Sequence, residues 1–211
     1  MRRTVRTGWL ASISLMAILA IAGNPTSSRA GDMLFLVATR DLPDPLFAQT
    51  VILMIPNMPP PLVVGLIVNK PTGRRLSDLM PASPLLKSRT EDAYFGGPVD
   101  IEAPAIVMRA GDPPSHATAL FDGVYAVLDP EQAVTMLKSH AAVKDMRLYF
   151  GRSQWSREQL HSEMLRNSWY VVPADPASVF SSEPKTIWRA LVERAELQKA
   201  SFVLEPVPYP Q

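Results

Sequence analysis

Three apolar runs near the start of the chain decide its fold: MLFLVA at residues 33–38, QTVILMI at 49–55 and LVVGLIV at 62–68. Each run has the length of a β-strand and is continuously apolar, which is typical of strands that are covered on both faces. The links between them are short, so we expect the runs to pair as an antiparallel meander. Gly65, in the middle of the third run, indicates a bulge or a close backbone approach.

Helices and strands alternate along the rest of the chain. Further strands are predicted at residues 105–108, 124–128, 146–150 and 169–172, and a short helical piece at 76–80. Three longer helices are predicted at 130–139, 157–166 and 185–199, the first two from the capping patterns at Asp129 and Ser156. The last helix carries an apolar stripe that should pack on the sheet, formed by Ile187, Trp188, Leu191, Val192 and Ala195.

Residues 1–30 have the layout of a secretory signal peptide. Three arginines near the N-terminus precede an apolar run from Trp9 to about Gly23, and small residues stand at Ser28 and Ala30. The apolar run holds roughly 13 to 15 residues, whereas a membrane-spanning helix needs about 20. We therefore predict export by the general secretory route and cleavage after about Ala30. The alternatives are an uncleaved membrane anchor and twin-arginine export.

Residues 31–211 are predicted to form one exported domain, periplasmic or secreted. They carry 17 basic and 20 acidic residues, so their net charge is −3, a poor match for nucleic acid or for an anionic membrane surface. The chain has no cysteine, which excludes disulfides, thiolate nucleophiles, Cys-ligated zinc and lipoprotein attachment. We expect no cofactor, no stable membrane span after cleavage, and a protein or small-molecule partner in the cell envelope.

Five separated segments resemble the YqgE/AlgH family. In chain order they are residues 44–51 (DPLFAQTV), 65–72 (GLIVNKPT), 96–99 (GGPV), 151–160 (GRSQWSREQL) and 167–169 (NSW). Together they extend the resemblance over about residues 33–191. The family pattern usually has Tyr and Gly where this chain has Arg152 and Gln154, and the signal peptide departs from the usual cytosolic members.

The resemblance implies a single α+β domain with a largely antiparallel, partly closed β-sheet and flanking helices. It implies little about activity, because the family has no agreed biochemical function. A role in transcriptional regulation is suggested for alginate-related members, and this alternative stays open by analogy.

Catalytic and metal-binding patterns are weak. The segment Gly151-Arg152-Ser153-Gln154-Trp155 begins like a nucleophile elbow but ends in Trp where the turn needs glycine. The three histidines, His116, His140 and His161, lie far apart in the sequence and predict no metal site. An envelope hydrolase using Ser153, with His161 and an acid such as Asp129 or Glu158, remains the enzymatic alternative.

The leading hypothesis is a non-enzymatic binding or regulatory module in the cell envelope. No catalytic residue is assigned. If a ligand groove exists, we expect it where the family-like segments converge, at Asn69, Thr72, Gly96, Gly97, Arg152 and Trp155. Gly96-Gly97 is expected to serve first as a structural turn, and Trp155 and Trp169 are expected in the core.

The export prediction is tested by cell fractionation followed by N-terminal sequencing. We expect the mature protein outside the cytoplasm with Gly31 at or near its N-terminus, because signal peptidases cleave after small residues. Protein that keeps Met1 in the soluble cell interior would contradict the prediction.

Overall fold

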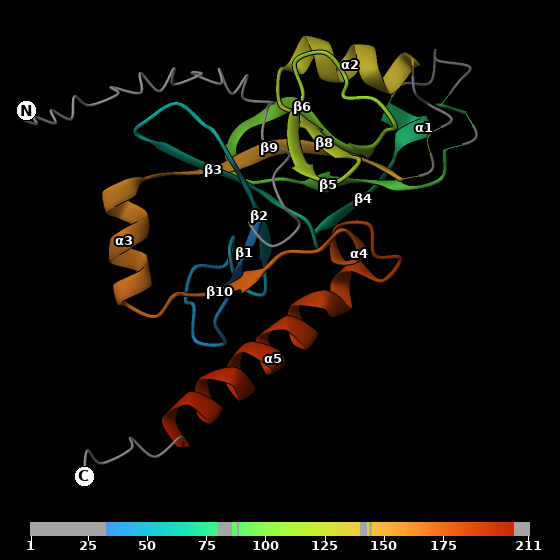
Figure 1. Cartoon of the computed structure of the whole chain (residues 1–211). Coiled ribbons are helices and arrows are strands. Elements are labelled where there is room, and N and C mark those ends of the chain that lie inside the picture. The colour runs from blue at the N-terminus through green and yellow to red at the C-terminus, as the bar shows by residue number, and fades with distance from the viewer. Residues whose placement is uncertain (1–32, 80–85, 88, 140–142, 144, 205–211) are drawn as a thin grey trace, which may run out of the picture.

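A long sheet curls through the domain and forms a half-barrel, with helices packed around it (Figure 1). The structure is a computed structural model that describes residues 33–79, 86–87, 89–139, 143 and 145–204. The ten strands are β1 (Leu34–Ala38), β2 (Val51–Ile55), β3 (Leu62–Ile67), β4 (Pro71–Arg75), β5 (Asp92–Phe95), β6 (Val99–Arg109), β7 (Thr118–Phe121), β8 (Val124–Val127), β9 (Met146–Ser156) and β10 (Trp169–Pro173). The helices are α1 (Leu76–Leu79), α2 (Pro130–Ser139), α3 (Arg157–Leu165), α4 (Pro176–Val179) and α5 (Pro184–Leu204). In the described residues, no helix is both long and apolar enough to cross a membrane.

The sheet is almost entirely antiparallel, as predicted. Its main path runs β10-β1-β2-β3-β9-β6-β8-β7, and β4 pairs with β5 beside it. The one parallel pairing in the described part of the chain joins β5 to β9. The meander β1-β2-β3 follows the first three apolar runs, with Leu36 opposite Ile52 and Leu53 opposite Leu66. The fold is therefore the α+β class that the sequence predicted.

The first three strands are covered on both faces, which explains their continuous apolar runs. Alternate residues such as Phe35 and Leu53 belong to the core enclosed by the curled sheet, where the stripe of α5 also packs. The residues between them, such as Leu36 and Ile52, face a second core that includes Trp155 and Trp169. A third core lies between α2 and the strands β6, β8 and β9.

Strand β9 holds the two halves of the sheet together. Its first half pairs with β6 and β5, and its second half pairs with β3, apart from Arg152, which lies opposite Val99 of β6. Gly151, at φ 72°, stands between the halves, and the Gly96-Gly97 backbone passes directly over it. The N–H of Gly96 donates to the Phe150 carbonyl at 2.8 Å, and the Gly96 carbonyl accepts from the Ile67 N–H at 3.0 Å. We call this contact the glycine crossing.

The sequence prediction differs from the structure mainly around this crossing. Residues 151–156 were expected to leave the strand, but β9 continues to Ser156. Strands β4, β5 and β7 correspond to no strand predicted from the sequence. These strands are short or polar, so their pairing depends on partners distant in sequence. The close approach expected at Gly65 is present, because an added Cβ would crowd Ile52 and the Leu53 carbonyl of the adjacent strand.

Replacing Gly97 with alanine tests the glycine crossing. A Cβ at Gly97 would clash with the backbone of Arg152 and Ser153, and its φ of 148° disfavours any side chain. We expect Gly97→Ala to lower the free energy of unfolding by at least about 2 to 3 kcal/mol, measured by urea denaturation.

Gly111→Ala is the matched control, because a Cβ at Gly111 meets no atom within 4 Å. The control should change stability by less than about 1 kcal/mol. Equal effects of the two substitutions would contradict the role given to the crossing.

Candidate functional site

A cavity of about 480 Å³ opens between the β1–β2 loop, helix α3 and the turn that leads into β10. Its lining includes Phe47 from the loop, Glu163 from α3 and Trp169 from the start of β10. Three of the five segments that resemble the YqgE/AlgH family meet here, namely residues 44–51, 151–160 and 167–169. We call this space the aromatic cavity.

Phe47 and Trp169 line the aromatic cavity, and the ring of Trp155 packs against both of them. Phe47 lies 5.9 Å from Trp155 and 5.8 Å from Trp169, measured between ring centroids, and the two indoles meet edge to face at 6.1 Å. Trp155 and Trp169 are only 2% and 5% exposed, so the prediction that they belong to the core is confirmed. Phe47 is half-buried and is the ring with the greatest access from the cavity.

The Glu163 carboxylate fixes both indoles. Its Oε2 accepts hydrogen bonds from Nε1 of Trp155 at 3.1 Å and from Nε1 of Trp169 at 2.8 Å. Its Oε1 accepts from Nε2 of Gln159, one turn earlier on α3, at 2.9 Å. Helix α3 itself starts where the Ser156 hydroxyl accepts from the Gln159 N–H, as its capping pattern predicted. A charged acceptor shared by two buried N–H groups makes a rigid base.

Side chains from the Asn69-Lys70 segment hold the loop that carries Phe47. The Asn69 amide accepts from the Val51 N–H and donates to the Gln49 carbonyl, both at 2.8 Å. The Lys70 ammonium donates to the Leu46 carbonyl at 2.8 Å. Burial lowers the pKa of Lys70, and the nearby Asp44 carboxylate acts in the opposite direction. These bonds fix the position of Phe47 before any ligand arrives.

The turn between α3 and β10 closes the other side of the aromatic cavity. Asn167 adopts the left-handed conformation at φ 54°, which asparagine tolerates better than most residues. Its carbonyl accepts from the Thr39 hydroxyl at 3.0 Å, and the Ser168 carbonyl accepts from the Thr39 N–H at the same distance. The Asn-x-Trp segment thus positions Trp169 against the β1–β2 loop.

Carboxylates outnumber cations on the lining of the aromatic cavity. Asp41, Asp44 and Glu163 contribute three carboxylates, and Arg166 contributes one guanidinium. Asp41 is exposed at the rim, whereas Asp44 accepts from the Leu46 N–H and shapes the loop. An aromatic base beneath a carboxylate rim suits a cationic group, which gains from the ring faces and from the negative charge together.

The residues predicted to form a ligand groove lie in separate places. Asn69 supports the β1–β2 loop, and Trp155 is buried against Phe47. Gly96 and Gly97 are buried at the glycine crossing, in the link between β5 and β6.

The other two residues of that set also lie outside the aromatic cavity. Arg152 is paired with Asp100 at 2.7 Å. Thr72 donates to the Ala93 carbonyl and lines a different cavity, of about 330 Å³, beside Phe150. Ligand binding by the six residues remains a prediction, but the structure does not bring them to one cavity.

The residues of the hydrolase alternative do not form an accessible catalytic set. Ser153 is fully buried within β9, and its hydroxyl donates to the Gly96 carbonyl at 3.2 Å. A substrate cannot reach that oxygen, so the enzymatic alternative built on Ser153 loses its nucleophile. His161 and Glu158 are exposed on α3, Asp129 caps α2, and His140 lies outside the described residues. Among the described residues, no group of three or more His, Asp or Glu side chains is arranged to hold a metal ion.

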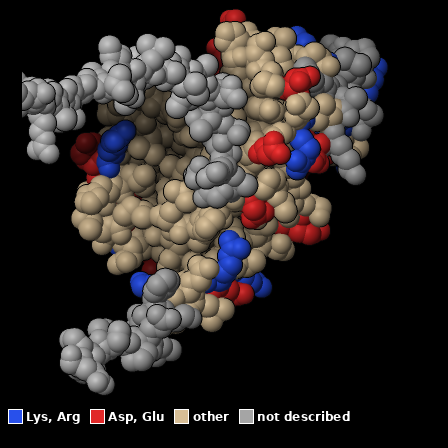
Figure 2. Space-filling view, in the orientation of Figure 1, with Lys and Arg blue, Asp and Glu red and all other residues tan. Residues whose placement is uncertain are grey.

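Phe47, Glu163 and Asp41 are the residues of the aromatic cavity that sequence reasoning missed. Phe47 lies in the family-like segment 44–51, and its place in that segment was the available sequence signal for a functional role. Glu163 is on a helix of mixed polarity, and only the fold shows that its carboxylate meets two indoles. On the face shown in Figure 2, acidic and basic side chains are scattered among each other, with no broad basic patch.

Comparisons with known proteins relate the chain to one family. The sequence pattern described as AlgH-like matches residues 35–200. A UPF0301 protein of Streptomyces avermitilis is 27% identical over 81% of this chain and 90% of its own length. A relative of the same name from Mycobacterium tuberculosis is 26% identical over 87% of this chain and 91% of its own length.

Solved structures show the same fold. The AlgH protein from Pseudomonas aeruginosa superposes with a TM-score of 0.62 at 22% identity, covering 89% of this chain and all of its own. A protein from Corynebacterium diphtheriae gives a TM-score of 0.61 at 24% identity, covering 83% of this chain and 87% of its own.

The role of Glu163 is tested by Glu163→Gln. The neutral amide is a weaker acceptor and cannot serve both indoles equally, so we expect a loss of about 1 to 2 kcal/mol in the free energy of unfolding. The tryptophan fluorescence of the folded protein should also change. Glu102→Gln, at an exposed position of β6, is the control and should leave both quantities unchanged. Equal stability and equal fluorescence of the two variants would contradict the role given to Glu163.

Proposed function

The chain belongs to the AlgH-like family, and on that premise we propose that it is an exported, non-enzymatic binding or regulatory module that holds a cationic group of a protein partner in the aromatic cavity. The observation that carries the proposal is the convergence of three family-like segments on one cavity, which they line with Phe47, Gln159 and Trp169. Segments distant in the sequence supply the loop, the base and the closing turn of a single site. The fully buried Ser153 hydroxyl supports a binding role over hydrolysis.

The chemistry of the aromatic cavity argues for a lysine or arginine side chain as the bound group. An ammonium or guanidinium group above Phe47 would interact with the ring face and with the exposed Asp41 carboxylate. The cavity of about 480 Å³ has room for one such side chain and part of the segment that carries it. An anionic group would face three carboxylates and one arginine, which disfavours it.

Export of the module is supported by the amino-acid pattern of residues 1–30, which lie outside the described residues. The domain also has no cysteine that an oxidising compartment could cross-link wrongly. The proposed partner is accordingly a protein of the cell envelope that presents a basic side chain.

Site-specific photo-crosslinking in intact cells tests the proposal. A photoreactive phenylalanine analogue at position 42, in place of the half-buried Leu42 that lines the aromatic cavity, should give one discrete adduct in the envelope fraction. Asp41→Lys in the same chain should reduce the adduct at least tenfold, because the reversed charge repels a cation.

Two controls make the result specific. Asp112→Lys, at an exposed residue outside the aromatic cavity, should leave the amount of adduct unchanged. The same photoreactive analogue in place of the exposed Ile101 should give no adduct of the same mass. An adduct that survives Asp41→Lys, or the absence of any adduct at position 42, would contradict the proposed function.

A further inference from the structure

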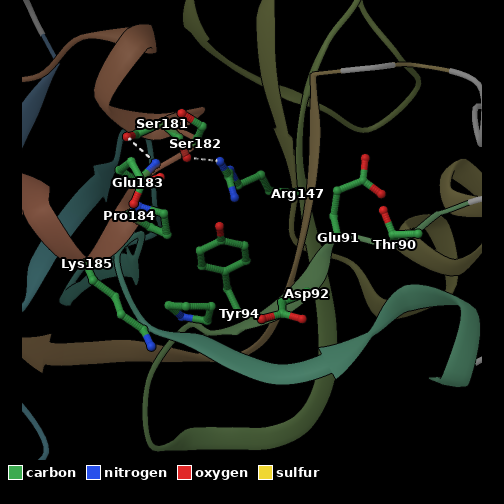
Figure 3. A pocket seen from close by; sticks show the side chains of 11 residues that line it. Thr90, Glu91, Asp92, Tyr94, Arg147, Ser181, Ser182, Glu183, Pro184 and Lys185 are labelled. Carbon is green, nitrogen blue, oxygen red and sulfur yellow. Dashed lines mark hydrogen bonds between the residues drawn. The ribbon is translucent and has the colours of Figure 1, made fainter.

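A second and larger cavity, of about 600 Å³, lies away from the aromatic cavity, where the start of β9 and strand β5 face the segment between α4 and α5 (Figure 3). Arg147 of β9 and Ser181 line one side, and Glu91 and Asp92 line another. The Tyr94 ring lies between the two sides, and Lys185 of α5 lies at the edge. Opposite charges therefore face one space from different elements of the fold.

Arg147 is the residue that distinguishes this cavity. Its guanidinium lies 4.5 Å from the centre of the Tyr94 ring and donates from Nη2 to the Ser181 carbonyl. Its Nε is buried and has no hydrogen-bond partner among the described residues. No ion pair joins Arg147 to a carboxylate in the part of the chain that the structure describes. Since arginine stays protonated at neutral pH, a half-buried positive charge is left without a carboxylate in ion-pair contact, although Glu91 lies near enough to act on it electrostatically.

A second polar group beside Arg147 is also unsatisfied. The Tyr149 hydroxyl is fully buried, and within the described residues it has no hydrogen-bond partner. The Tyr149 ring packs at a tilt against the Tyr94 ring, with 5.6 Å between the ring centroids. Buried polar groups are normally paired, so each unpaired one calls for an explanation, such as a bound ion or water. The Arg147 Nε and the Tyr149 hydroxyl are thus two buried polar atoms without a partner among the described residues.

The opposite side of the cavity supplies negative charge. Glu91 is paired with Arg89 at 3.1 Å, so part of its charge is used within the protein. Asp92 is half-buried on β5, and among the described residues it forms no ion pair. Glu183 is exposed at the edge, near the second cation Lys185. A simple anion would be attracted to Arg147 but repelled by these carboxylates.

We propose that this cavity binds a zwitterionic amino compound, a free amino acid or short peptide, whose carboxylate meets Arg147 and whose ammonium group meets Asp92. A carboxylate fits the planar guanidinium by paired hydrogen bonds, and an ammonium group offers three donors to Asp92. Both unpaired charges are then balanced by one ligand. A cavity of about 600 Å³ accommodates a molecule of this size with its side chains.

Titration of the ¹⁵N-labelled domain with blocked and unblocked alanine peptides tests the proposal. The probes are L-alanine, L-alanyl-L-alanine and L-alanyl-L-alanyl-L-alanine, together with the N-acetyl and C-amide forms of each. We expect at least one unblocked probe to shift the amide signals of residues 91–94 and 147 saturably. Blocking either end should weaken that binding at least about tenfold. No saturable shift with any unblocked probe, or equal binding of the N-acetyl form, would overturn the proposal.

Variants of the two charged residues provide the second arm. Arg147→Gln and Asp92→Asn should each weaken binding of the unblocked probe at least about tenfold, whereas Arg147→Lys should retain part of it. Arg157→Gln and Asp112→Asn, at exposed positions elsewhere, are the matched controls and should bind as the original chain does. Asp92→Asn keeps the proposal testable if Arg147→Gln fails to fold, because Asp92 takes no part in the contacts of Arg147. Unchanged binding by Asp92→Asn would contradict the zwitterionic assignment.

Discussion

The close backbone contact at the glycine crossing is the constraint on which the rest of the structure depends. Gly97 lies against the Arg152–Ser153 peptide, and Gly96 lies against Gly151, at distances that exclude any side chain. The crossing lets one strand, β9, pair with β6 and β5 over its first half and with β3 over its second. Without it, the two parts of the curled sheet would have no shared strand.

Both cavities take their key residues from this divided strand. Arg147 lies in the first half of β9 and lines the cavity beside α5, whereas Trp155 lies in the second half and packs against Phe47 and Trp169, which line the aromatic cavity. The Gly151 conformation separates the two pairings, so the register of each half is fixed by different neighbours. The same feature that closes the sheet therefore positions both proposed binding sites.

The fold was more predictable from the sequence than the site was. Local apolar patterns in the sequence predict strands β1 to β3 and the buried stripe of α5, because each pattern indicates its element whatever the partner that buries it. Strand β4, with the exposed residues Thr72 to Arg75, has no such pattern and exists because β5 pairs with it. The link between Glu163 and two indoles joins residues that no local rule relates, and the unpaired state of Arg147 is visible only in three dimensions.

The central claim, that the aromatic cavity receives a cationic side chain, is tested most directly by the indole N–H signals of the mature domain. The indole N–H groups of Trp155 and Trp169 donate to Glu163. The indole N–H of Trp188, on α5, donates instead to the Ala38 carbonyl of β1 and serves as an internal reference. On titration with N-acetyl-lysine methylamide, the account predicts saturable shifts for Trp169 with Trp188 unmoved, and none with N-acetyl-glutamate methylamide. Identical responses to the two probes, or none to either, would contradict it.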